Sequence, residues 1–117
     1  MPKDENSAFE RRIYPDIEEW SLIRLTCSEG DYSASRIARA VEDCDCHLVN
    51  LNVTGEHYGE SHRPVVELRA SSSNVMSVSR SLERYGYEIL SAESSAGNIS
   101  NETAMLRLEE LMRYFQV

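Results

Sequence analysis

The first part of this sequence that could do chemistry is the run Cys44-Asp45-Cys46-His47. Thiolates and imidazoles are ligands that suit zinc and copper. The spacing here is Cys-x-Cys-His, which differs from the Cys-x-x-Cys of a tight chelating loop. We therefore predict that Cys44 and Cys46 are small buried apolar residues. A metal-binding or catalytic domain that uses Cys44, Cys46 and His47 is the alternative.

The first candidate for ligand contact is a polar loop between a predicted strand and a predicted helix. It consists of Ser28, Glu29, Gly30, Asp31, Tyr32 and Ser33. Free N–H groups and the positive dipole end of the following helix favour a bound carboxylate. The carboxylates of Glu29 and Asp31 oppose an anionic ligand. A tight turn with a helix cap is the simpler interpretation of the same residues.

Two asparagines complete the predicted ligand-binding set. Asn50 and Asn52 alternate with Val49, Leu51 and Val53 in a segment with the period of a β-strand. The valines and Leu51 are predicted to share one face of the strand and the asparagines the other. We expect Asn50 and Asn52 to contact a ligand or a partner on that second face.

The elements that position these residues follow one another in the order β-α-β-β-α-β. The predicted strands and helices span 20–27, 32–44, 46–56, 62–70, 73–85 and 87–93. This order is typical of the α+β ferredoxin-like fold with a four-stranded antiparallel sheet. Right-handed crossovers place both helices on one face of the sheet and leave the other face open. A hairpin loop is predicted over 54–61, which contains two glycines.

Three regions are predicted along the chain. Residues 1–19 form a flexible N-terminal arm or linker, and 20–94 form the folded domain. Residues 95–117 form a linker and a C-terminal helix that packs on the sheet or on a partner subunit. Its interface residues recur at helical spacing and are Met105, Leu108, Met112 and Phe115.

Composition excludes several classes of function. The 117-residue chain carries 20 acidic and 12 basic residues, a formal charge of −8, and its only lysine is Lys3. Such a chain repels phosphate backbones, so we expect no nucleic-acid and no membrane partner. Three cysteines and a polar N-terminus without a signal peptide favour a cytoplasmic location. No nucleophile elbow, P-loop or dinucleotide fingerprint occurs, so we predict neither an enzyme nor a cofactor.

Three motifs occur in an order found in a known family. They are DYSASRIARAVE at 31–42, ERYGYEI at 83–89 and LEELMRYFQV at 108–117. Together they resemble the ACT-like domain at the C-terminal end of certain bacterial proteins that begin with paired CBS domains. The common ACT turn carries a glycine that lets a ligand approach the backbone, and Tyr32 stands at that position here.

The resemblance implies a regulatory domain of ACT type that senses a small molecule and dimerises. A homodimer is expected, with an amino acid as the family's usual effector and a CBS-domain protein as partner or parent chain. A purely structural dimerisation tail without a ligand is the second alternative.

Overall fold

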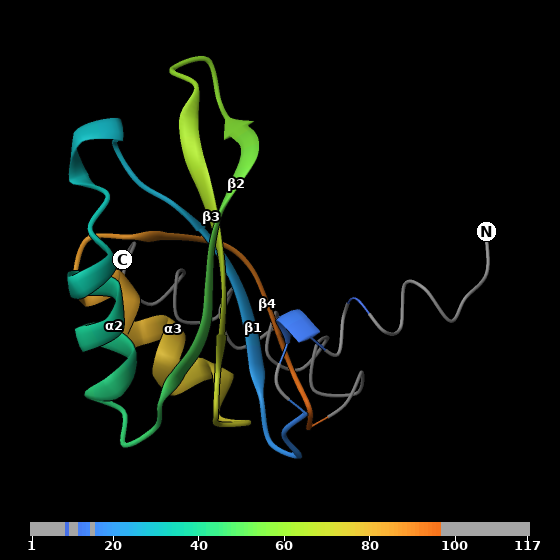
Figure 1. Ribbon diagram of the computed structural model, residues 1–117. Coiled ribbons are helices and arrows are strands. Elements are labelled where there is room, and N and C mark those ends of the chain that lie inside the picture. Colours follow the sequence, from blue (N-terminus) through green and yellow to red (C-terminus); the bar gives the residue numbers. More distant parts are fainter. Residues whose placement is uncertain (1–8, 10–11, 15, 97–117) are drawn as a thin grey trace.

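The computed structural model describes residues 9, 12–14 and 16–96. The predicted C-terminal helix, with Met105, Leu108, Met112 and Phe115, lies outside the described residues. The elements are the strands β1 (Ser21–Thr26), β2 (Leu48–Tyr58), β3 (Arg63–Ala70) and β4 (Glu88–Ser94), the α-helices α2 (Ala34–Glu42) and α3 (Val75–Arg84), and the short 3-10 helix η1 (Glu29–Asp31) (Figure 1).

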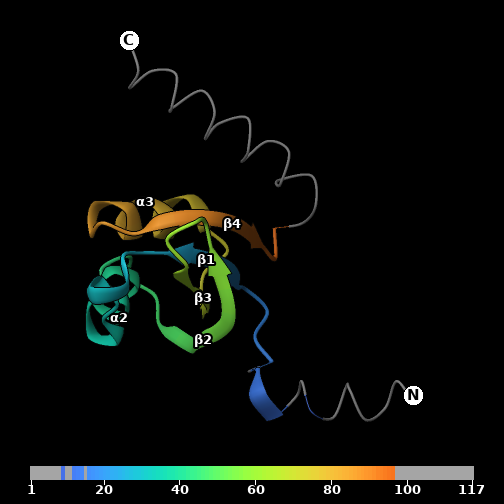
Figure 2. The ribbon, with the colours of Figure 1, turned by 90° about the horizontal axis from the view of Figure 1, so that it is seen from above.

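The four strands form one antiparallel sheet in the order β2-β3-β1-β4. Viewed from above, α2 and α3 lie on the same side of this sheet (Figure 2). The protein is therefore an α+β fold with a four-stranded antiparallel sheet and two α-helices, compatible with a ferredoxin-like arrangement. Within the part of the chain that the structure describes, no helix is long and apolar enough to cross a membrane.

Side chains along β1 point alternately to the helix-covered face of the sheet and to its open face. Ile23 and Leu25 are fully buried on the helix side, whereas Leu22 and Arg24 are half-buried. The partner strands repeat the pattern at matching positions, because Leu68 pairs with Ile23 and is also fully buried. The apolar core thus lies between the sheet and the helices, as the sequence predicts.

Both helices begin at a side-chain cap. The Ser33 hydroxyl accepts the Arg36 N–H at 3.3 Å at the start of α2, and Asn74 Oδ1 accepts the Ser77 N–H at 3.2 Å at the start of α3. After α3 the chain turns at Gly86, whose φ of +97° favours glycine. These local signals fix where each helix begins and ends.

The β2–β3 hairpin differs from the prediction. A loop is predicted over 54–61, but β2 continues to Tyr58, and a turn from Gly59 to His62 reverses the chain. The hairpin forms an arm that extends beyond the helices (Figure 1). Its residues are polar because the arm is exposed to solvent, and an exposed strand lacks the apolar alternation that identifies a buried one. An ion pair between Arg24 and Glu56 ties the arm to β1.

Candidate functional site

The loop 28–33 forms a capped turn at the end of β1. Ser28 accepts the Asp31 N–H at 2.9 Å through its carbonyl, and the four residues from Ser28 to Asp31 are exposed. Tyr32 packs against the apolar core. The Ser33 hydroxyl caps α2 and is therefore already engaged with a backbone N–H of that helix. These contacts agree with the turn-and-cap interpretation of the loop.

The two asparagines lie on the sheet face that α2 and α3 leave open. Asn50 is opposite Arg69, and its side-chain amide donates to the Ile13 carbonyl at 3.2 Å. The Arg69 guanidinium lies 3.9 Å from the centre of the Tyr14 ring, which is cation–π geometry. Residues 13 and 14 thus contact the open face beside Asn50.

The structure does not bring the loop and the asparagines together. Asn50 and Leu22 are both paired with Arg69, so Asn50 lies at the level of the start of β1. Ser28 follows Leu22 by six residues, which is roughly 20 Å of extended strand. The predicted ligand-binding residues therefore form two separate groups, one at the end of β1 and one on the open face.

The thiols of Cys44 and Cys46 form hydrogen bonds to backbone carbonyl groups inside the domain. The Cys44 thiol donates to the carbonyls of Ala40 and Ser77 at 3.6 and 3.5 Å, and the Cys46 thiol donates to the Val41 carbonyl at 3.4 Å. The His47 ring is exposed, 3.6 Å from the Glu42 carboxylate. No group of three or more potential metal ligands occurs within residues 9, 12–14 and 16–96.

We expect the buried thiols to make the stability of this domain sensitive to alkaline pH. Burial raises the pKa of the Cys27 and Cys46 thiols above their ordinary value of about 8.5. Unfolding lowers both pKa values, so the unfolded chain loses protons first as the pH rises. We expect the free energy of unfolding to fall as pH increases above about 8.5. Urea titrations from pH 7 to 10 test this, and a Cys27→Ala, Cys46→Ala variant should show a weaker decline.

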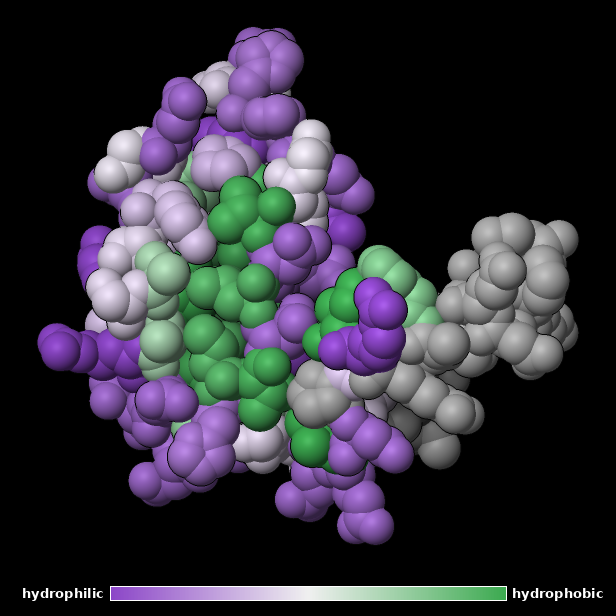
Figure 3. Space-filling model, viewed as in Figure 1, coloured by the Kyte–Doolittle hydropathy of each residue, from purple (hydrophilic) through white to green (hydrophobic). Residues whose placement is uncertain are grey.

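A feature that the sequence analysis did not single out is the outer edge of β2. Val53 is 49% exposed, and Leu48, Val49 and Leu51 are half-buried. In the space-filling view, apolar side chains form a column over this side of the molecule (Figure 3). Residues 48–55 contain no charged side chain, although the chain carries a net charge of −8. The absence of charge in residues 48–55 was therefore the feature of the sequence that could have indicated this apolar edge.

The opposite edge of the sheet has a different character. β4 carries Glu88 and Glu93, and both are exposed. Charged side chains on an edge strand disfavour pairing with another strand. Of the two edges of this sheet, β2 is therefore the one suited to association.

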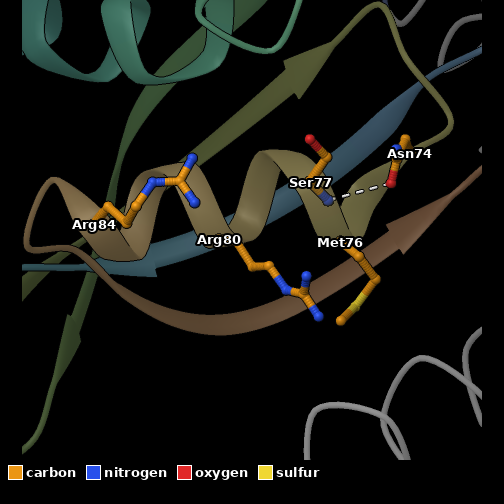
Figure 4. A pocket seen from close by; sticks show the side chains of 5 residues that line it. All are labelled: Asn74, Met76, Ser77, Arg80 and Arg84. Carbon is orange, nitrogen blue, oxygen red and sulfur yellow. Dashed lines mark hydrogen bonds between the residues drawn. The ribbon is translucent and has the colours of Figure 1, made fainter. Parts of the chain in front are cut away.

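A cavity of about 350 Å³ lies along α3 (Figure 4). Its lining residues are Asn74, Met76, Ser77, Arg80 and Arg84. Arg80 and Arg84 are one helical turn apart, and neither forms an ion pair with another residue that the structure describes. Guanidinium groups bind carboxylates and phosphates. The cavity thus offers positive charge to a small anion on an acidic protein.

Comparisons with known proteins do not place this chain in a family. No family model matches it, and neither the curated proteins nor the solved structures give a match.

Proposed function

We propose that this chain is a non-catalytic regulatory module of ACT type, with a ferredoxin-like βαββαβ core and an additional C-terminal helix. In this proposal it acts in the cytoplasm, binds a small effector and pairs with a second copy of itself. The observation that carries the proposal is the apolar, uncharged outer edge of β2 beside an open sheet face. Edge strands that remain single are commonly protected by charges or proline, and residues 48–55 have neither.

The sensing part of the proposal has support from the cavity on α3. Arg80 points to the same side of α3 as Met76 (Figure 4), so it provides a cationic group for a carboxylate beside an apolar contact, and Arg84 adds a second positive charge to the lining. An amino acid, the usual effector of ACT domains, has a carboxylate for the arginines and a side chain for the apolar wall. The loop 28–33, which the sequence favours, is the alternative place for this contact.

Regulation in such a module would follow from a shift in population. An effector that binds one arrangement of two subunits more tightly than another changes their equilibrium only by that difference in affinity. A CBS-domain partner or parent chain would carry the output. The C-terminal segment with Met105 and Phe115, which the sequence predicts to be helical, would supply further apolar surface for this contact.

Two measurements on the complete chain test the proposal. Light scattering should give a dimer at a protein concentration of about 100 μM. A concentration this high is needed because an interface limited to a strand edge is small and has modest affinity. A thermal-shift screen against amino acids should find a ligand that, at 100 times its Kd, adds about 2.7 kcal/mol to the free energy of unfolding.

Variants connect the ligand to the cavity. Replacing Arg80 and Arg84 together by glutamine should abolish the thermal shift. Arg39→Gln, at an exposed position on α2, is the matched control and should retain the shift. A monomer at this concentration contradicts the proposed dimer. A dimer that no amino acid or nucleotide stabilises would instead indicate a structural dimerisation domain.

A further inference from the structure

The centre of β2 is symmetrical in sequence. Residues 49–53 read Val-Asn-Leu-Asn-Val in either direction about Leu51. This symmetrical segment lies on the apolar outer edge of β2, whose backbone has no neighbouring strand within the described residues. A strand that is the same in both directions presents like residues to a second copy that runs antiparallel to it.

We propose that two copies of this chain pair through β2 in antiparallel orientation, with the two-fold axis at Leu51, to form one continuous eight-stranded sheet. The inference rests on the proposed function, because it specifies how the proposed dimer is built. Two-fold symmetry makes the contact self-complementary, since each residue and its counterpart exchange roles.

The pairing places chemically matched side chains opposite one another. Leu51 faces Leu51 of the partner subunit on the helix side of the sheet, and Asn50 faces Asn52 of the partner subunit on the open side. Asparagine side chains both donate and accept hydrogen bonds, so these amides can bond to one another across the seam. Val53 lies opposite Val49 of the partner subunit, beside the point where the register of β2 with β3 shifts. No like charges meet within 48–54, which removes the repulsion expected between two acidic chains.

Neighbouring registers match less well. With the axis at Asn52, Leu51 would face Val53 of the partner subunit and Asn50 would face Thr54 of the partner subunit. With the axis at Asn50, Leu51 would face Val49 of the partner subunit, at the point where the register of β2 with β3 shifts. The pairing of β2 with β3 supports the choice, because its register is regular from Asn50 to Val53 and shifts on both sides of that segment. The regular part of the edge therefore contains the proposed axis.

Charge substitutions at the two asparagines test the register. Asn50→Asp combined with Asn52→Asp places carboxylates opposite each other in the dimer and should weaken association at least tenfold. Asn50→Asp combined with Asn52→Lys places aspartate opposite lysine of the partner subunit and should restore it. Sedimentation velocity over a concentration series measures both, and circular dichroism verifies that each variant is folded.

Inside each subunit the two variants differ at one position, where aspartate is repelled by the opposed Glu67 and lysine is attracted to it, so the folding stability of both is measured as well. Both variants carry the same Asn50→Asp change opposite Arg69, and they differ only at residue 52, opposite Glu67. Asn52 is exposed, so either substitution is compatible with the fold. A lysine that fails to restore a dimer lost with aspartate, in a folded variant, would overturn the register.

Cysteine cross-linking locates the axis directly. The Cα atoms of directly opposed residues are about 4.5 to 5.5 Å apart, which is within reach of a disulfide. Leu51→Cys should therefore form a disulfide-linked dimer under mild oxidation, beyond the background of the wild-type chain with its three cysteines. Val53→Cys is the control on the same strand. Its two copies would be separated by four residues along the strand, or roughly 13 Å, and should not cross-link.

The outcomes separate this inference from the proposed function. A dimer that cross-links through Val53→Cys and not through Leu51→Cys would overturn the register and leave the dimer in place. A monomeric wild-type chain would remove both.

Discussion

Replacing Leu68 by alanine should lower the free energy of unfolding by about 2 to 5 kcal/mol. Leu68 is fully buried in β3, where it is opposite Ile23 of β1 and Leu51 of β2. Truncation removes apolar contacts on both sides and leaves a cavity, which the paired backbones of the three strands resist closing. Urea denaturation followed by circular dichroism measures the loss.

Leu22→Ala is the matched control for this prediction. Leu22 lies in β1 on the open face of the sheet and is only half-buried. The same chemical change there removes less buried surface and should cost clearly less than Leu68→Ala. Equal losses for the two variants would mean that the open face is as tightly packed as the helix face, and would contradict the one-sided core.

Most of the fold was predictable because each strand and helix buries one face, so its apolar residues recur at regular spacing along the sequence. Ile23 and Leu25 alternate with half-buried neighbours in β1, and Ile37 and Val41 occupy one stripe of α2. Such periods identify strands and helices from sequence alone. The caps Ser33 and Asn74 are similarly local signals.

The hairpin arm and the site were harder to predict for a common reason. Strand residues of the arm, such as His57, are held in place by pairing with β3. Their side chains are exposed on both faces, so apolar and polar residues do not alternate along this part of the strand. The distance between residues on different strands depends on which residues of those strands pair with each other. The sequence indicates this pairing only through the pattern of buried and exposed side chains. The separation of Ser28 from Asn50 is a consequence of register.

Two serines in α3 should respond to the same substitution with opposite signs. Ser79 and Ser81 are each 1% exposed. The Ser81 hydroxyl donates to the Ala40 carbonyl at 2.6 Å and so joins α3 to α2. The Ser79 hydroxyl has no hydrogen-bond partner among the residues that the structure describes. Burying a polar group without a partner is costly, whereas a satisfied one contributes to stability.

We therefore expect Ser81→Ala to lower the free energy of unfolding by about 1 to 2 kcal/mol and Ser79→Ala to raise it by about 1 kcal/mol. The pair controls for helix propensity, because alanine is gained in the interior of the same helix in both variants. The difference between the two unfolding free energies thus combines the hydrogen bond to Ala40 with the cost of the unpartnered Ser79 hydroxyl, free of the change in helix propensity. If both variants gained stability equally, the contact between α2 and α3 would depend on apolar packing alone, and the Ser81 hydroxyl would contribute nothing to holding the helices on the sheet.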